Sequence, residues 1–139
     1  MYKIKTEASF AAAHSLPNHP GKCKNLHGHR WRVIVEVEVD NYDPNTGMVI
    51  DFSNLKRIIR ERTERLDHQH LNDLLKATIT NPTAENLAKF LHEDMVKDID
   101  GILTGDIGFL LTVTVEESPG CEVAYSDGNW RVSGATDYA

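Results

Sequence analysis

The sequence predicts an α+β domain, in which an antiparallel sheet of four strands carries two helices on one face. The first observation is an alternation of apolar and polar residues, which is typical of half-buried strands. This alternation runs through residues 2–14, 29–40, 107–117 and 121–126. The second observation is helical spacing of apolar residues in two stretches between the second and third strands, residues 51–66 and 83–95. The order is therefore ββααββ, within one domain spanning residues 1–139.

The first two strands have the most regular pattern. Phe10 and His14 lie on the apolar face of the first strand, because residues two apart in a strand point to the same side. In residues 29–40, Trp31 and the valines that follow at every second position take one face, and charged residues take most of the other. Residues 15–26 are rich in Pro, Gly and Asn, which indicates a loop between the two strands.

Each predicted helix begins after a residue that can cap it. Asp51 precedes the first helical stripe, and Thr83 follows an Asn-Pro pair before the second. The segment LDHQHLND, residues 66–73, is predicted to end the first helix. His19 and His92 are expected at the surface.

Composition argues against several classes of function. The net charge of −6 disfavours non-specific binding to nucleic acid or to an anionic membrane, since both need a basic surface. The longest apolar runs fall far short of the roughly 20 residues of a membrane helix. No early apolar stretch resembles a signal peptide, so we expect a cytoplasmic protein. Two cysteines, Cys23 and Cys121, are too few to suggest a disulfide scaffold.

The edges of the predicted sheet bear on its assembly. A sheet of four strands leaves two edges, and these strands are long and apolar on one face. Exposed edges of this kind invite pairing with other chains. We therefore expect a homo-oligomer.

Three histidines form the candidate catalytic centre. His27 and His29 are two residues apart at the start of a strand, so their imidazoles leave the same face. Antiparallel pairing with the preceding strand brings His14, at the end of that strand, beside them. Three imidazoles with an open fourth position are typical of a catalytic zinc site. The sequence therefore predicts a Zn²⁺ centre with His14, His27 and His29 as ligands.

Two alternatives stay open for these residues. Each histidine can be an ordinary hydrogen-bonded strand residue that binds no metal. Alternatively, Cys23, which lies in a polar loop four residues before His27, is a fourth ligand. The zinc site would then be structural rather than catalytic.

Two further groups of residues can carry chemistry. Asp67 next to His68 is a candidate carboxylate–imidazole pair for proton transfer, and spacing alone does not separate His68 from His70. Strand alternation puts Glu117 on the apolar face, where a carboxylate needs a partner, and Glu116 on the exposed face. Glu117 can therefore bind adjacent N–H donors of a ligand, or form a salt bridge at the end of the strand.

Together, these segments resemble the 6-pyruvoyl-tetrahydropterin synthase / 6-carboxy-tetrahydropterin synthase family. The matching pieces follow the family's order over nearly the whole chain. They are FAAAH (10–14), CKNLHGH (23–29), GMVIDFSNLK (47–56), LDHQHLN (66–72), NPTAENLA (81–88) and VEES (115–118). The resemblance implies the tunnelling fold, whose subunits join through their sheets into barrels, commonly hexamers of two trimers with sites between subunits.

The resemblance also implies a role for each candidate residue. The three histidines match the family's zinc ligands. Cys23 matches the catalytic thiolate, and Asp67 with His68 matches its proton-relay partners. Glu117 matches the residue that anchors the pterin ring, because it precedes Ser118 where the family has a Glu-Thr pair.

Within the family, the sequence is most similar to the bacterial 6-carboxy-5,6,7,8-tetrahydropterin synthases of queuosine and deazapurine synthesis. Leu26 and Trp31 stand where the animal pyruvoyl enzymes favour a proline and a longer HGHGHNY-like run. Cys23 disfavours a folate-pathway branch that has glutamate there. The expected substrate is 7,8-dihydroneopterin triphosphate, and the expected products are the carboxypterin, acetaldehyde and triphosphate. The alternatives are a 6-pyruvoyl-tetrahydropterin synthase and a non-catalytic pterin- or zinc-binding protein. A third alternative is a three-histidine zinc hydrolase unrelated to pterins, which would not explain Glu117.

Overall fold

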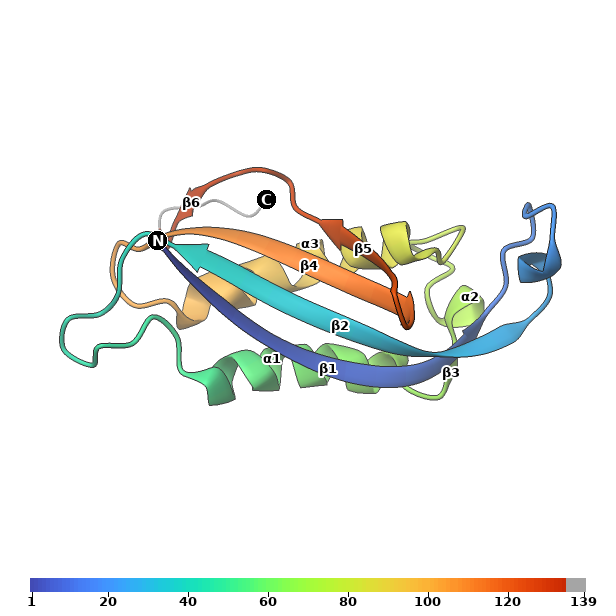
Figure 1. Ribbon diagram of the computed structural model, residues 1–139, viewed down its shortest axis with the longest axis horizontal. Coiled ribbons are helices and arrows are strands. Elements are labelled where there is room, and N and C mark those ends of the chain that lie inside the picture. Colours follow the sequence, from blue (N-terminus) through green and yellow to red (C-terminus); the bar gives the residue numbers. More distant parts are fainter. Residues whose placement is uncertain (135–139) are drawn as a thin grey trace.

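The computed structural model describes residues 1–134, and the order of its elements confirms the predicted α+β fold. One sheet forms a layer of the molecule, and the two long helices lie behind it on one face (Figure 1). Within the described residues the sheet has six strands, in the order β3-β1-β2-β4-β5, with β6 paired to β4. The four predicted strands are thus present, and two short ones are added.

The long strands form the centre of the sheet. β1 (Tyr2–His14) pairs antiparallel with β2 (His27–Val39) along its whole length. β2 also pairs with β4 (Gly108–Ser118), which pairs in turn with the shorter β5 (Cys121–Tyr125). The predicted bounds of these strands are correct to within two residues.

Helices α1 (Phe52–Leu66) and α3 (Ala84–Ile102) begin where their capping residues predict. The side chain of Asp51 accepts a hydrogen bond from the Ser53 backbone N–H, and Thr83 accepts one from Asn86. The apolar stripes of both helices pack against the apolar face of the strands, where they form one continuous core.

Residues 67–73 differ from the prediction, which placed residues 66–73 at the end of the first helix. α1 ends at Leu66, and the chain then forms β3 (Gln69–His70) and one helical turn, α2 (Leu71–Leu74). β3 pairs in parallel with the end of β1. Beside this pairing, the hydrogen bond from Ala11 N–H to Asp67 Oδ1 joins residues that are 56 positions apart in sequence. The local spacing of residues cannot predict such a contact.

Two other short elements lie in segments that were predicted as loop or left unassigned. The 3-10 helix η1 (Lys22–Lys24) lies in the loop that projects beyond the end of β1 and the start of β2 (Figure 1). β6 (Arg131–Val132) pairs with the first two residues of β4, Gly108 and Phe109. No helix in residues 1–134 is long and apolar enough to cross a membrane.

His92 is buried, and the expectation that it lies at the surface was wrong. It is 1% exposed, its Nε2 lies 3.2 Å from the Leu111 carbonyl oxygen, and its ring packs edge-on against Tyr125. His92 lies four residues from both Ala88 and Val96, which are buried on the same side of α3. Helical spacing therefore contained the signal that places it in the core.

The two edges of the sheet differ in length. β5 forms one edge. At the other edge, β3 covers β1 only at Ala12 and Ala13. Among the described residues, no strand lies beside the outer edge of residues 2–10, so this long edge keeps free hydrogen-bonding groups.

Candidate metal centre

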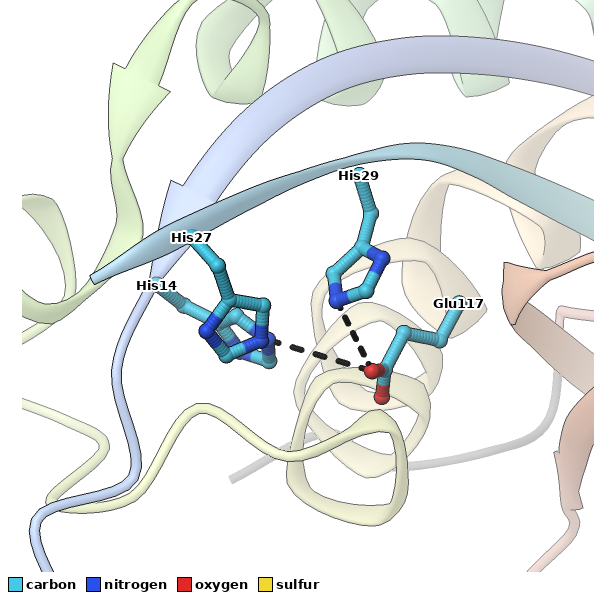
Figure 2. A group of neighbouring side chains, drawn as sticks. All are labelled: His14, His27, His29 and Glu117. Carbon is cyan, nitrogen blue, oxygen red and sulfur yellow. Dashed lines mark ion pairs between the residues drawn. The ribbon is translucent and has the colours of Figure 1, made fainter. Parts of the chain in front are cut away.

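Three histidines meet where β1 ends and β2 begins (Figure 2). His14 lies opposite His27 in the ladder, and Ala12 lies opposite His29, so the three imidazoles leave the helix-facing side of the sheet at neighbouring positions. The ring centre of His14 is 4.6 Å from that of His27 and 5.3 Å from that of His29. The structure thus brings together the three side chains that the sequence predicts as zinc ligands.

Backbone carbonyls determine which ring nitrogen faces this cluster. Nδ1 of His14 lies 2.8 Å from the Pro82 oxygen, and Nδ1 of His27 lies 2.7 Å from the Asn25 oxygen. A carbonyl only accepts hydrogen bonds, so each of these Nδ1 atoms carries the proton and each Nε2 keeps its lone pair.

The three Nε2 atoms are a set of possible metal-binding atoms. In all three histidines Nε2 is buried and has no hydrogen-bond partner among the described residues. Burying an unpaired polar atom is costly, so the arrangement needs a ligand to compensate it. Imidazole nitrogens suit zinc and related divalent ions, and the residues present therefore fit such a metal.

Burial keeps His14 in its neutral form. Desolvation lowers the pKa of this fully buried imidazole below the usual 6.5, although the hydrogen bond to Pro82 and the charge of Glu117 act in the opposite direction. Only a neutral imidazole can bind a metal. The protonation state of His14 near pH 7 is therefore the one that a metal centre requires.

Glu117 reaches the cluster from a β-bulge at the end of β4. Glu116 lies opposite Glu122, and Ser118 lies opposite Cys121, so Glu117 is the extra residue between two pairs. Bulges of this kind bend a strand and redirect a side chain. Periodicity predicted the face on which Glu117 lies, but it gave no sign of the bulge.

The Glu117 carboxylate lies directly against the imidazoles. Its Oε1 is 2.9 Å from His29 Nε2 and 4.0 Å from His14 Nε2 (Figure 2). The shorter contact lacks hydrogen-bond geometry, so we treat it as an electrostatic contact. Within residues 1–134, these three histidines and Glu117 form one group of possible metal-binding side chains, with ligand atoms within 4.8 Å of one another.

Glu116, predicted to be exposed, is instead half-buried in an ion pair. Its carboxylate lies 3.0 Å from a terminal nitrogen of Arg32, and its side chain is only 16% exposed. Arg32 lies opposite Glu116 in the ladder and also pairs with Glu7 on β1. The predicted polar face is correct, but charged side chains from the neighbouring strands cover it.

Trp31 packs beneath the histidine cluster. The indole is fully buried, and its ring centre lies 4.9 Å from that of His14 and 5.5 Å from that of His29, edge-on to both. Its Nε1 donates a hydrogen bond to the Ala12 carbonyl oxygen at 3.2 Å. Trp31 therefore restricts two of the three imidazoles from the core side.

Cys23 is a half-buried free thiol in η1, outside the cluster. Its backbone carbonyl accepts a hydrogen bond from Leu16 N–H at 2.8 Å, which closes the loop. Cys23 is not among the four grouped side chains of residues 1–134. This arrangement disfavours the alternative in which Cys23 completes a structural zinc site.

Asp67 and His68 lie at the outer edge of β1, just after α1. Asp67 Oδ1 accepts a hydrogen bond from Ala11 N–H at 2.8 Å, and Oδ2 lies 2.7 Å from His68 Nδ1. These two hydrogen bonds, the one from Ala11 first, lower the pKa of Asp67. His68 has a φ of 59°, which is uncommon for a residue other than glycine, and its side chain is 82% exposed.

His70 has a carboxylate partner of its own. Its Nδ1 lies 2.9 Å from Asp73 Oδ2, so each of the two histidines that spacing could not separate is paired with an acid. The side chain of His70 is 38% exposed, less than half the value for His68. His68 is therefore the better placed of the two to reach another molecule.

Three residues around the centre were not singled out from the sequence. Asn25 and Pro82 act through their backbone carbonyls, and the side chain of Asn72 binds the backbone beside His14. Backbone carbonyls leave no compositional signal. All three residues do lie inside the matching segments 23–29, 66–72 and 81–88, which was the one available indication.

The chain is similar to known proteins over most of its length. Residues 3–128 match the family model for 6-pyruvoyl tetrahydropterin synthase. Over 95 residues the chain is 44% identical to a 6-carboxy-5,6,7,8-tetrahydropterin synthase from Synechocystis sp., a match that covers 66% of this chain and 72% of that protein. A protein of the same name from Haemophilus influenzae is 35% identical over 119 residues, which covers 70% of this chain and 84% of that one.

The fold agrees with these matches. The solved structure of the Caenorhabditis elegans 6-pyruvoyl tetrahydropterin synthase superposes with a TM-score of 0.71 at 26% identity, and the match covers 91% of this chain and 96% of that one. The predicted tunnelling fold is thereby confirmed. The family match includes every candidate site residue from His14 to Glu117. The chain therefore belongs to the 6-pyruvoyl tetrahydropterin synthase family.

Proposed function

We propose that the protein is a zinc-dependent carbon–carbon lyase, a 6-carboxy-5,6,7,8-tetrahydropterin synthase. It converts 7,8-dihydroneopterin triphosphate and one water to 6-carboxy-5,6,7,8-tetrahydropterin, with release of acetaldehyde and triphosphate, as a step toward queuosine and other deazapurines. The observation that carries the proposal is the convergence beside Glu117 of three buried imidazole Nε2 atoms that have no hydrogen-bond partner among the described residues. The names of the Synechocystis and Haemophilus relatives support the carboxy product.

His14, His27 and His29 would hold the zinc ion through their Nε2 atoms. Their donor set, with two Nδ1 atoms tied to backbone carbonyls, is the arrangement expected of a catalytic site with an open position. A zinc ion held there supplies a Lewis acid for the hydroxyl groups of the substrate side chain.

Glu117 would anchor the pterin ring. A carboxylate has two acceptor oxygens, and the ring edge of a pterin presents adjacent N–H donors that can bind both. The Glu117 carboxylate lies 2.9 Å from His29 Nε2, so a ring bound there would lie against the imidazoles.

Cys23 would act as the base that removes a side-chain proton from the substrate. The thiolate is the reactive form of cysteine. Lys22 and Lys24 flank Cys23 in η1, and both are exposed. The position of Cys23 outside the histidine cluster leaves its thiol free for proton transfer.

Asp67 and His68 would handle the return of the proton. Asp67 lies 2.7 Å from His68 Nδ1 and so fixes the tautomer that leaves Nε2 to exchange a proton. The His68 ring is 82% exposed at the edge of the sheet and is not in the cluster of its own chain. We therefore infer that this pair serves the site of a neighbouring subunit.

The assembly that this requires is a homo-oligomer, for which we favour a hexamer. The free outer edge of residues 2–10 on β1 and the edge formed by β5 can pair with copies of the chain, which continues the sheet from subunit to subunit. The Asp67–His68 pair lies at this same β1 edge, because Asp67 binds Ala11 N–H. Edge pairing would bring it next to another chain.

Product analysis tests this function. The purified protein is incubated with 7,8-dihydroneopterin triphosphate, and the products are identified by mass spectrometry. The proposal predicts 6-carboxy-5,6,7,8-tetrahydropterin with acetaldehyde and triphosphate in equal amounts. A pyruvoyl pterin without acetaldehyde would instead identify a 6-pyruvoyl-tetrahydropterin synthase. Pterin binding with no turnover would identify a non-catalytic binding protein.

A further inference from the structure

The segment after α1 runs along the last residues of β1 and holds them in place. His68 N–H donates to the Ala11 carbonyl oxygen, and Asp67 Oδ1 accepts from Ala11 N–H. β3 then pairs with Ala12 and Ala13. The next contact along both segments joins Asn72 to Ser15, the residue that follows His14.

The Asn72 side chain binds both backbone groups of Ser15. Its Oδ1 accepts a hydrogen bond from Ser15 N–H at 2.8 Å, and its Nδ2 donates to the Ser15 carbonyl oxygen at 2.8 Å. A planar amide with an acceptor and a donor side by side matches these two groups. Both hydrogen bonds are partly buried, so water competes for them only weakly.

This pair of hydrogen bonds lies where the ladder ends. The last pair of the β1–β2 ladder is His14↔His27, and beyond it the chain leaves the sheet. A backbone held on one side only is free to open locally at such an end. The two hydrogen bonds of the Asn72 amide fix the backbone at Ser15, directly after His14.

The His14 ring adds a second constraint, which acts on its orientation. The ring is fully buried, and its Nδ1 binds the Pro82 carbonyl oxygen at 2.8 Å. That hydrogen bond turns the ring, but the position of the ring also depends on where the His14 backbone lies. Metal–ligand distances tolerate changes of only about 0.2 Å.

We propose that Asn72 is a positioning residue for the metal centre. Its amide, through Ser15, sets where His14 Nε2 lies relative to the Nε2 atoms of His27 and His29. The inference rests on the metal centre of the proposed function and adds a residue that touches neither metal nor substrate. It predicts that Asn72 controls metal affinity in protein that remains folded.

The test measures zinc affinity by competition with a chelator, in the full chain at fixed pH. Asn72→Ala removes both hydrogen bonds, and a lost outer partner of a metal ligand typically lowers affinity about 10–100-fold. Asn72→Asp keeps the acceptor for Ser15 N–H but replaces the donor by a carboxylate oxygen that the Ser15 carbonyl oxygen repels, so its affinity is also expected to fall below that of the wild type. Asn45→Ala, in the exposed loop before α1, is the matched control and is expected to bind zinc like the wild type.

A second readout reports geometry directly. The visible absorption of the cobalt-substituted protein depends on the arrangement of the ligands around the metal. Asn72→Ala is expected to shift or weaken these bands, and Asn45→Ala is expected to leave them unchanged. A residue that only stabilised the fold would not alter them in protein that is still folded.

The outcomes separate this inference from the metal proposal on which it rests. If the wild type binds no zinc, the metal centre itself fails. If the wild type binds zinc and the folded Asn72 variants bind it as tightly, with only a lower unfolding temperature, the positioning role is overturned. Should Asn72→Ala not fold, the affinity and cobalt spectrum of Asn72→Asp decide by the same criteria.

Discussion

Glu116 and Glu117 are neighbours in β4 whose environments are opposite. Glu116 faces the polar side of the sheet, where Arg32 neutralises it at 3.0 Å. Glu117 faces the helix side, where its nearest charged or ionisable partners are the imidazoles of His29 and His14. A single step along the strand therefore separates a structural ion pair from a carboxylate available to a ligand.

Exchanging each glutamate for glutamine tests this difference. Glu117→Gln keeps the shape but loses the charge that two N–H donors prefer, so pterin binding is expected to weaken about 10–100-fold. Glu116→Gln is expected to leave pterin affinity unchanged, because its partner is Arg32. Titration with a pterin, followed by its fluorescence, measures both. Equal losses in the two variants would show that Glu117 is not the anchor.

Cys23 is the residue on which the proposed chemistry depends most. Cys23→Ala is expected to lower turnover about 10²–10⁴-fold, the usual contribution of a general base. Zinc content and pterin affinity are expected to stay near those of the wild type, because Cys23 is not in the histidine cluster of the described residues. Loss of zinc from this variant would make Cys23 a ligand, and turnover near the wild-type rate would remove it from the mechanism.

At the scale of elements, the packing of α3 on the sheet includes one titratable side chain. His92 on α3 is buried against β4 and β5, where it contacts the Leu111 carbonyl oxygen and the Tyr125 ring. Burial lowers its pKa, and the hydrogen bond to Leu111 together with the charges of Asp127 and Glu93 only partly offsets that, while Arg131 adds to it. His92 is therefore neutral in the folded chain near pH 7.

This lowered pKa makes stability depend on pH. Below the ordinary value of 6.5, the unfolded chain binds a proton at His92 more readily than the folded chain does, so the free energy of unfolding falls as the pH drops. His92→Phe keeps an aromatic ring and removes the titration. We expect a shallower fall between pH 7 and pH 5 in His92→Phe, measured by urea unfolding. The buried His14 contributes to both proteins alike, so parallel curves would contradict this account of His92.

The same scale shows what the sequence could and could not predict. The alternation in residues 2–14 and 29–40 predicted both strands and their faces, because a half-buried strand repeats every two residues. The pairing of these strands then brought the three histidines together. β3 and α2 were missed because they depend on long-range hydrogen bonds, such as those of Ala11 with Asp67, and these have no local period.

Side-chain contacts between neighbouring strands could not be predicted from the sequence either. The burial of Glu116 follows from the register that puts it opposite Arg32, and the bulge at Glu117 follows from the pairing of β4 with β5. The Asp67–His68 pair was a candidate from its adjacent residues, whereas the catalytic role of Cys23 and the choice of His68 over His70 came from the family resemblance.

At the scale of the whole molecule, the candidate groups divide into two sets. The histidines and Glu117 meet at the end of the sheet, and Asp67 with His68 lies at the outer edge of β1. His68, whose ring is exposed, lies at the same edge of the sheet as the uncovered part of β1. We infer that a complete site needs a second copy of the chain.

Mixing two inactive variants tests this inference. Cys23→Ala and His68→Ala are each expected to be nearly inactive, and unfolding and refolding them together in equal amounts yields mixed oligomers. If the two residues meet across subunits, about a quarter of the sites regain both, since half keep Cys23 and half of those adjoin an intact His68. Activity is measured against each variant refolded alone. No recovery in verified mixed oligomers would place both residues in one chain's site.

The central claim is that His14, His27 and His29 hold a zinc ion, and metal analysis of the purified protein tests it most directly. The wild type is expected to hold about one zinc per chain after zinc addition and desalting, and His27→Ala to hold almost none, because two imidazoles bind zinc far more weakly than three. His19→Ala, an exposed histidine in the loop between β1 and β2, is the control and is expected to keep its zinc. A wild-type protein without zinc, or full zinc content in His27→Ala, would contradict the claim.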